Sequence, residues 1–558
     1  MSLSFIAVIV IGLLAAAYFT YGRFLARHFD LHEERVTPAH DLADGIDYVP
    51  TPKGFLLAQH FSAIAAAGPI VGPILAGLWF GWLPVLLWIV IGGVFFGAVH
   101  DFSSLVGSIR HRGHSIVELV NEYFGRRGYL IFLVFVWLSL LYVITAFTDL
   151  TSHSFVEPDL GGGVATSSLL YLALGAAMGV CLSRFRMPLG RATLLFMPLV
   201  LFSIWLGQKI PLVMPSAFGM SPQQIWNIVL ILYCFAASII PVWVLLQPRG
   251  YLGGIFLYGT LAAGVIGLFM GGEQIHYPAF TGFHAANGLP MFPLLFVTVA
   301  CGACSGFHGI VCSGTTSKQV DKETDSKLLG YGGMLLESLV AVIALSTVMI
   351  LAKGDALTGS SPDRIYAEGL SRFVSNLGVP RDFARAFVLL AFTTFIYDTL
   401  DVATRLTRHL LQELTGWKGR GGRIAATLLS LAIPLFCVSV TMTDPQGNLI
   451  PAWRVFWTIF GTSNQLLAAL TLLILSTWLM KNGKSAWISI VPMIFMFAMT
   501  LWSLGIVIRS SVMLFIAKGR FDAVGPIAVL LFLLAAALAA EAFKAWRNAR
   551  SASAAALR

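Results

Sequence analysis

Long runs of apolar residues, separated by short polar segments, follow one another along the whole chain. A helix needs about 20 apolar residues to cross the ~30 Å hydrocarbon core of a bilayer. The alternation over ~10 residues that is typical of membrane barrel strands does not occur. The pattern therefore predicts an all-α polytopic membrane protein. About fifteen transmembrane helices are expected, at residues 3–21, 57–80, 83–107, 129–148, 164–182, 192–208, 224–246, 251–272, 291–313, 327–352, 384–403, 424–442, 455–478, 485–508 and 523–545.

The composition leads to the same class of protein. Hydrophobic residues make up 57% of the 558 residues, and charged residues make up only 11%. Soluble domains usually carry about 25% charged residues, and a soluble fold of this length could not bury so much apolar surface. In a bilayer the outer faces of the helices contact lipid, so membrane lipid is an expected partner.

The net charge of +9 arises from basic residues in particular loops. If the spans begin with the N-terminus outside, the inner loops hold 26 Lys and Arg residues and the outer loops hold 9. Cytoplasmic loops of membrane proteins carry such an excess. The distribution predicts an external N-terminus and a cytoplasmic C-terminus, and it argues against a nucleic-acid partner.

The first span is expected to be retained in the protein. No basic residue precedes it, and Arg23, Arg27 and Arg35 follow it. A cleaved signal peptide has its basic residues first. The remaining polar segments are short, and the longest, 22–56 and 353–383, contain cap and turn residues that favour short surface helices.

The six cysteines lie in or beside apolar spans, so no disulfide framework is expected. Cys301 and Cys304 have the spacing of a redox or metal pair, but a second pair is missing from the sequence. Small, soft side chains at a helix contact explain them better. The sequence therefore predicts neither a metal site nor a cofactor.

Two spans differ from a plain lipid-facing helix. The first contains two Gly-Pro steps, Gly68-Pro69 and Gly72-Pro73, and the second is the Gly- and hydroxyl-rich segment 301–319. Proline removes backbone donors and weakens a helix, and irregular backbone at membrane depth must be satisfied by protein or water. The two spans run in opposite directions, which predicts an inverted-repeat transporter core with two discontinuous helices.

A substrate site is expected between the two breaks, where backbone N–H groups would meet a carboxylate. The alternative is that Gly and Pro only permit a kink and close helix packing. The candidate substrate-binding residues are Gly68, Pro69, Gly72, Pro73, Ser305, Gly306 and His308.

Several ionisable residues lie deep in predicted spans, where a charge costs several kcal/mol. Glu337 is the first candidate for proton coupling because the nearest lysine, Lys327, is about 15 Å away along a helix. Asp398 is the second candidate, and Asp101 and His60 are further ones. Each of these residues could instead be a paired or packing residue.

Two other polar groups have simple structural explanations. Asp401 and Arg405 are four residues apart on one helix face and can pair at the inner interface. Asn464 and Gln465 can hydrogen-bond to neighbouring helices.

Several motifs, in order over most of the chain, resemble the carbon starvation protein A family. They are residues 45–51 (GIDYVPT), the Gly-Pro break at 68–73, 97–102 (GAVHDF), 305–319 (SGFHGIVCSGTTSKQ), 337–339 (ESL), 398–405 (DTLDVATR), 412–413 (QE) and 461–470 (GTSNQLLAAL). Long strings such as SGTTSKQ are specific. Two positions depart from the family pattern, since His100 stands where Gln is expected and Gly309 where Ser is expected.

The resemblance implies a secondary active transporter of the bacterial inner membrane, which imports peptides or small carboxylates during carbon starvation. Some members take up pyruvate with protons, so a proton-coupled pyruvate symporter is the alternative, and the expected coupling ion is the proton. The resemblance also implies a transporter core over 1–380 and a C-terminal five-helix part over 381–558.

A membrane-embedded enzyme or sensor is the rival class, because buried carboxylates and histidines could do chemistry. The sequence contains neither a His-Glu-x-x-His zinc motif nor a Gly-x-x-x-x-Gly-Lys-Ser/Thr phosphate loop. The missing phosphate loop also argues against a primary pump. We therefore expect a transporter rather than an enzyme.

Overall fold

The computed structural model describes residues 2–45, 47–65, 67–241, 244–286, 288–440, 442–443, 449–519 and 524–556. This part of the chain is almost entirely helical, apart from one short antiparallel pair of β1 (Met442–Thr443) and β2 (Leu449–Ile450). Thirteen of its helices are long and apolar enough to cross a membrane, and α4 and α5 together form a fourteenth, bent span. The predicted all-α polytopic membrane protein is confirmed.

The unbroken spans differ from the predicted ranges mainly at their ends. They are α1 (Leu3–Phe19) with α2 (Tyr21–His28), α6 (Trp82–Gly92) continuing through η1 (Gly93–Gly97) into α7 (Ala98–Arg110), α8 (Ile116–Phe155), α9 (Gly161–Ser183), α10 (Leu189–Lys209), α11 (Pro222–Ile239), α12 (Leu246–Gly271), η4 (Lys327–Gly332) with α16 (Gly333–Met349), α18 (Arg381–Thr415), α19 (Gly419–Ser439), α20 (Ala452–Lys481), α21 (Trp487–Lys518) and α22 (Val524–Ala556). Short helices lie in the two long polar segments, as expected, and beside the second broken span. They are α3 (Pro38–Asp41), η2 (Thr316–Lys318), η3 (Glu323–Asp325), η5 (Ala356–Gly359) and α17 (Pro362–Ser375).

Both predicted interruptions are present. The first separates α4 (Lys53–Ile64) from α5 (Gly68–Phe80) with a bend of 48°. The second predicted span, 291–313, divides into α13 (Met291–Thr298), α14 (Ala300–Ala303) and α15 (Gly306–Gly314). Cys304 and Ser305 are extended between α14 and α15, with φ of −166° and −113°. Unlike α4 with α5, the pieces of this second segment are not among the candidate membrane spans of the described residues.

The two broken helices are antiparallel neighbours. The first half, α4, packs against α15, and α5 packs against α13 and α14. Glycines allow this approach, since a Cβ on Gly68 would overlap Cys301 and a Cβ on Gly72 would overlap the Thr298 carbonyl. Contact between two interrupted helices of opposite direction confirms the inverted-repeat core.

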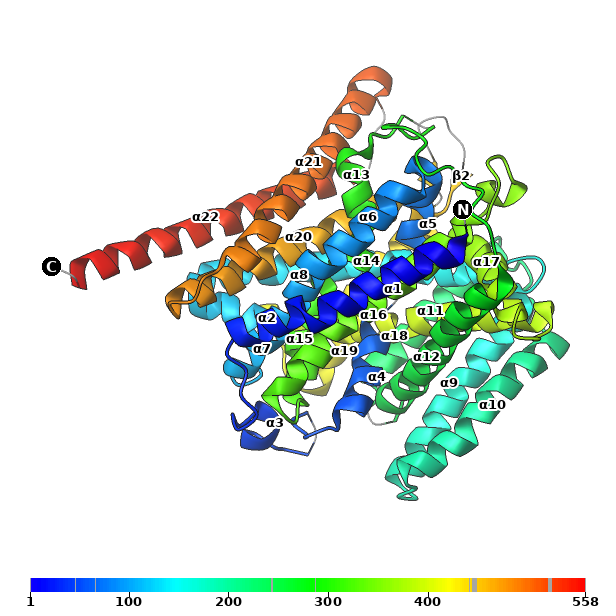
Figure 1. Cartoon of the computed structure of the whole chain (residues 1–558), viewed down its shortest axis with the longest axis horizontal. Coiled ribbons are helices and arrows are strands. Elements are labelled where there is room, and N and C mark those ends of the chain that lie inside the picture. Colours follow the sequence, from blue (N-terminus) through cyan, green and yellow to red (C-terminus); the bar gives the residue numbers. More distant parts are fainter. Residues whose placement is uncertain are drawn as a thin grey trace.

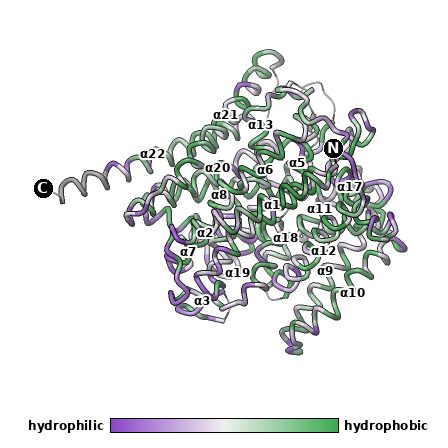
Figure 2. The backbone as a smooth tube through the Cα atoms, viewed as in Figure 1, coloured by the Kyte–Doolittle hydropathy of each residue, from purple (hydrophilic) through white to green (hydrophobic). Residues whose placement is uncertain are grey.

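Buried helices α8, α18 and α20 pack around this core, and two hairpins lie outside it (Figure 1). The α9–α10 hairpin and the α21–α22 hairpin lie at opposite ends of the molecule. Their outer faces expose large apolar side chains, such as Leu194 and Ile516. Hydrophilic residues gather mainly around α2, α3 and α7 and near α17 (Figure 2), so the apolar helix surfaces between these regions suit lipid.

The helix α8 begins earlier than the predicted span because a short helical segment precedes it, separated from the long part by a break at Gly125. Gly125 has φ of 76°, a left-handed conformation that glycine adopts without steric cost. The segment before this residue begins with a capping box between Ser115 and Glu118. The predicted start at residue 129 therefore identified only the long second part.

The helix α17 connects to the end of α8 through a buried carboxylate. Asp363 accepts a hydrogen bond from Ser154 Oγ at 2.8 Å and lies 3.6 Å from His153 Nδ1. Burial raises the pKa of Asp363, but the neighbouring His153 and hydroxyl donors outweigh burial and hold this pKa below its usual value. The Asp363 carboxylate thus links α17 to the C-terminal end of α8.

We expect Gly72→Ala to destabilise the protein because the added methyl group would overlap the backbone of α13. Overpacking of this kind costs about 1–3 kcal/mol. Gly259 lies in α12 with no neighbouring atom within 4 Å of an added Cβ, so Gly259→Ala should be neutral or slightly stabilising. Thermal unfolding of the detergent-purified variants measures both effects, and equal midpoints would contradict the close packing of α5.

Candidate functional site

Four buried ionisable side chains form a continuous chain across α7, α15 and α16, here called the histidine–carboxylate cluster. His100 Nδ1 lies 2.7 Å from Asp101 Oδ1, and His308 Nδ1 lies 2.8 Å from Asp101 Oδ2. The other ring nitrogen of His308, Nε2, lies 3.0 Å from Glu337 Oε2. All four side chains are at most 1% exposed. Three predicted candidates, Asp101, His308 and Glu337, are therefore direct neighbours.

The charges of this cluster do not balance when both carboxylates are ionised. His308 faces a carboxylate with each ring nitrogen, an arrangement that a doubly protonated imidazolium satisfies. With His100 counted as a neutral imidazole, because its Nε2 has no hydrogen-bond partner among the described residues, one imidazolium and two carboxylates leave a net charge of −1. Within the described residues neither oxygen of Glu337 has a partner with hydrogen-bond geometry, although Oε2 lies 3.0 Å from His308 Nε2, whereas both oxygens of Asp101 have one. Glu337 is thus the carboxylate least stabilised in its charged form.

His60 lies beside this cluster on α4. Its Nδ1 is 2.9 Å from Thr316 Oγ1, and its Nε2 has no hydrogen-bond partner among the described residues. A Cβ on Gly333 would lie 3.1 Å from His60 Cδ2. Gly333 precedes Glu337 by four residues on α16, so both positions lie on one helix face.

A second buried group, here called the arginine–carboxylate cluster, links α12 to α18. Arg249 donates to Asp398 Oδ1 from Nε at 2.9 Å and from Nη2 at 2.6 Å. Its Nη1 lies 2.6 Å from Asp401 Oδ2. Ser62 of α4 donates to the other oxygen of Asp398, and Tyr233 donates to Asp401 at 2.9 Å. Asp398 is therefore held as a carboxylate by the guanidinium group and a hydroxyl group.

The expected pair of Asp401 and Arg405 is wrong. Arg405 donates instead to the carbonyls of Ala237 and Ile240, at 2.7 and 2.8 Å. Asp401 pairs with Arg249, which the sequence interpretation placed in an inner loop. Arg249 is fully buried in the first turn of α12. The sequence does contain a signal for this ion pair. Arg249 is the single charged residue between two apolar spans, and Asp398 and Asp401 are two acids within a distant span.

The candidate substrate-binding residues are all buried, and they occupy two places along the contact between the broken helices. A Cβ on Gly302 would lie 3.8 Å from both Pro69 and Pro73, so the Gly-Pro turns of α5 pack directly on α14. Ser305 and Gly306 lie at the start of α15, against α20.

Asn464 of α20 satisfies the start of α15. Its Oδ1 accepts from the Phe307 N–H at 2.9 Å, and its Nδ2 donates to Ser305 Oγ at 3.0 Å. The prediction of hydrogen bonds to a neighbouring helix is confirmed for Asn464 and wrong for Gln465, whose side-chain oxygen and nitrogen have no partner among the described residues. In this conformation the Phe307 N–H, one donor that a substrate carboxylate could use, is occupied by Asn464.

Two cavities lead toward this region from one side of the molecule. The larger, here called the vestibule, has a volume of about 550 Å³ and lies among segment 45–51 and the ends of α4, α9, α12 and α15. The smaller, here called the inner chamber, has a volume of about 70 Å³ and is lined by His60, Ser62 and Asp398. The residues Gln59, Leu246, Thr315 and Gln319 line both cavities, so the two spaces adjoin.

The broken antiparallel helices, the buried charge clusters and the cavity that reaches them define a polytopic membrane transporter. The sequence model of one family, described as "Carbon starvation protein CstA", matches residues 2–363 and 356–503. The chain belongs to the carbon starvation protein CstA family.

Relatives with assigned names agree with this membership. A peptide transporter CstA of Mycobacterium tuberculosis is 32% identical over 89% of this chain and 74% of its own length. A peptide transporter CstA of Bacillus subtilis is 32% identical over 84% of each chain. The pyruvate/proton symporter BtsT of Escherichia coli is 29% identical over 91% of this chain and 82% of its own length.

Solved structures show the same fold at low sequence identity. A manganese transporter of Eremococcus coleocola has a TM-score of 0.50 and 13% identity, with 91% of this chain and 99% of that chain covered. MhsT in complex with L-phenylalanine has a TM-score of 0.50 and 12% identity, with 81% and 98% covered. The first is a transporter by name, and both likenesses concern the fold alone.

We expect Arg249→Met to destabilise the protein strongly, because it leaves two buried carboxylates without their cation. Removing one partner of a buried ion pair costs about 3–5 kcal/mol. Adding Asp398→Asn and Asp401→Asn to this variant should restore much of the folded yield, measured by size-exclusion chromatography in detergent. Arg405→Met, which removes bonds to carbonyls only, is the matched control. Equal yields of the single and triple variants would contradict this account of the cluster.

Proposed function

We propose that the chain is a secondary active transporter that imports short peptides across the bacterial inner membrane, driven by protons. The observation that carries the proposal is the contact between the two interrupted helices, α4–α5 and α13–α15, at the centre of a CstA-family fold. Discontinuous helices supply unpaired backbone groups for substrate at membrane depth. The names of the CstA relatives favour a peptide as substrate.

We propose an external N-terminus and a cytoplasmic C-terminus. The basic loops support this orientation, because 26 Lys and Arg residues were counted on the inner side and 9 on the outer side. The burial of Arg249 in α12 removes one residue from the inner count and leaves the asymmetry unchanged. The vestibule lies at the basic side, so the conformation faces the cytoplasm.

The proposed substrate site lies between Gly68–Pro73 of α5 and the start of α15. The Gly-Pro steps at Pro69 and Gly72, together with Ser305, Gly306 and His308, would contact the substrate when the outer side opens. In the inward-facing state, Asn464 takes the place of the substrate carboxylate. Its Oδ1 accepts the hydrogen bond from the Phe307 N–H that the carboxylate would otherwise accept.

The proposed proton carrier is Glu337. The net charge of −1 in the histidine–carboxylate cluster gives one added proton a favourable site, and the unpaired Glu337 oxygen supports its placement there. Asp101 shares the proton through His308, and His60 connects the cluster toward the inner chamber. Asp398 is the second candidate, although Arg249 favours its charged form.

A proton-coupled pyruvate symporter is the second candidate function. The BtsT relative, at 29% identity, favours it, and a single carboxylate would suit the same site. A membrane-embedded enzyme or sensor has less support, because the relatives with assigned names are transporters. Parallel uptake assays with labelled dialanine and pyruvate separate the two transport functions.

Proteoliposomes that contain the protein should accumulate labelled dialanine when the outside is more acidic than the inside. Ser305→Leu should abolish this uptake while membrane insertion stays intact, because the larger side chain fills the start of α15. Ser439→Leu changes an exposed serine at the end of α19 and should transport normally. Normal uptake by Ser305→Leu would show that Ser305 is not part of the substrate site. If the wild type takes up pyruvate but not dialanine, the pyruvate symporter is favoured.

Glu337→Gln should lose accumulation against a gradient but keep exchange of labelled for unlabelled substrate, because the amide resembles the protonated carboxyl group. Initial uptake under a proton gradient and counterflow without one measure the two activities. Asp398→Asn is the comparison variant. Accumulation by Glu337→Gln at the wild-type rate would make Glu337 structural, and the coupling proposal would pass to Asp398.

A further inference from the structure

The vestibule has the chemistry of a binding site rather than of a plain water-filled exit. Its lining includes one cation, Lys318, one carboxylate, Asp47, and the side-chain amides of Gln59, Gln247 and Gln319. It also includes an aromatic pair, because the rings of Phe55 and Tyr251 stack at 4.8 Å with an interplanar angle of 22°. A volume of about 550 Å³ falls within the 300–1,000 Å³ range of small-molecule sites.

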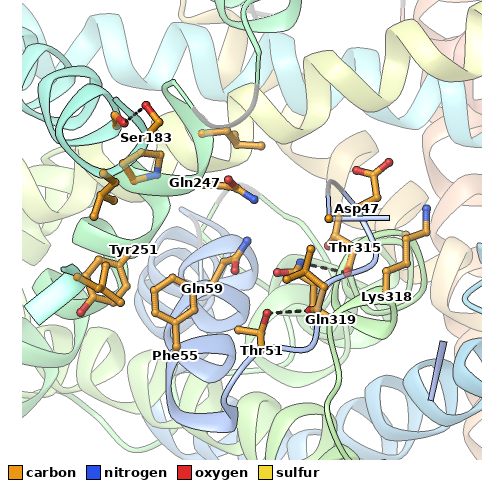
Figure 3. A pocket seen from close by; sticks show the side chains of 18 residues that line it. Asp47, Thr51, Phe55, Gln59, Ser183, Gln247, Tyr251, Thr315, Lys318 and Gln319 are labelled. Carbon is orange, nitrogen blue, oxygen red and sulfur yellow. Dashed lines mark hydrogen bonds between the residues drawn. The ribbon is translucent and has the colours of Figure 1, made fainter. Parts of the chain in front are cut away.

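These groups are separated across the cavity. Figure 3 shows Lys318 and Asp47 on one side, Phe55 and Tyr251 on the opposite side, and the amides of Gln59 and Gln247 between them. A charged end, a row of amides and an aromatic end match the carboxylate, the peptide bond and the apolar side chain of a short peptide.

The polar groups of the lining are available to a ligand. Throughout the described ranges Lys318 makes no ion pair, and its Nζ lies 5.4 Å from the centre of the Tyr48 ring. The side-chain amides of Gln59 and Gln247 likewise make no hydrogen bond to other described residues, although both line the cavity. Polar groups without protein partners gain when a ligand satisfies them.

The vestibule also lies on the route of the substrate. It adjoins the inner chamber at Gln59 and Thr315, and the inner chamber reaches His60 between α4 and α15. A molecule that moves from the broken helices toward the basic side through these cavities would meet the inner chamber first, and then the vestibule with Lys318. Pyruvate has a carboxylate for Lys318, but it has neither a peptide bond for the amides nor a side chain for the aromatic pair.

We propose that the vestibule is a second substrate site, which holds a short peptide with its C-terminal carboxylate at Lys318 and its N-terminal side chain against Phe55 and Tyr251. The inference rests on the proposed function and adds to it a second site and the orientation of the peptide in that site. It predicts a preference for peptides with a free C-terminus and an aromatic first residue.

The test compares Phe-Ala with its C-terminal amide, by calorimetric titration of the full-length protein in detergent. The wild type should bind Phe-Ala about tenfold more tightly than the amide, the effect of one charge-assisted hydrogen bond. Lys318→Gln should abolish this difference, and Lys318→Arg should retain it. Lys322→Gln is the matched control, because Lys322 pairs with Glu33 outside the vestibule lining.

A second variant tests the aromatic end. Tyr251→Ala should weaken binding of Phe-Ala severalfold and leave binding of dialanine unchanged. If Lys318→Gln still discriminates the amide from the free peptide, or weakens both equally, the vestibule site is wrong while peptide uptake stands. If the wild type neither binds nor transports any dipeptide, the proposed peptide function itself is wrong, and the vestibule site is wrong with it.

Discussion

Backbone groups at a helix break inside a membrane cannot be satisfied by lipid, and the core of this protein is organised around that constraint. Each break must therefore lie against protein. The extended residues Cys304 and Ser305 lie against α20, where Asn464 replaces the missing helical partner. The Gly-Pro turns of α5 lie against α13 and α14, and the small residues at both contacts bring the backbones close. The peripheral hairpins carry no such breaks and can face lipid.

The same constraint applies to charge, and the two buried clusters meet it differently. In the arginine–carboxylate cluster a guanidinium group of fixed charge bonds to both carboxylates and neutralises one of their two negative charges. In the histidine–carboxylate cluster the cation is an imidazole, whose charge depends on protonation. The cation of the first cluster, which joins α12 to α18, keeps its charge, whereas the cation of the second cluster can gain or lose its charge with a proton.

Much of the fold could be predicted from sequence, because apolar runs and Gly-Pro steps are local signals. The breaks near Pro69 and Ser305 followed from composition alone. The partners of the buried charges could not be predicted in this way. Asp401 has an arginine four residues away in sequence, but its ion pair is with Arg249, about 150 positions earlier. The two departures from the family pattern, His100 and Gly309, are distant in sequence and are in contact, since a Cβ on Gly309 would lie 3.0 Å from His100.

The twelve-residue helix α4 contributes to the vestibule and contacts both buried charge clusters or their neighbours. One face carries Phe55 and Gln59, another carries His60, and a third carries Ser62 beside Asp398. All three faces belong to one short helix, so a tilt of α4 would change these contacts together. A tilt that widens the vestibule would also move the Ser62 hydroxyl away from Asp398 and shift the His60 imidazole along α16. A movement of α4 would therefore couple the opening of the vestibule to a rearrangement of the buried charges.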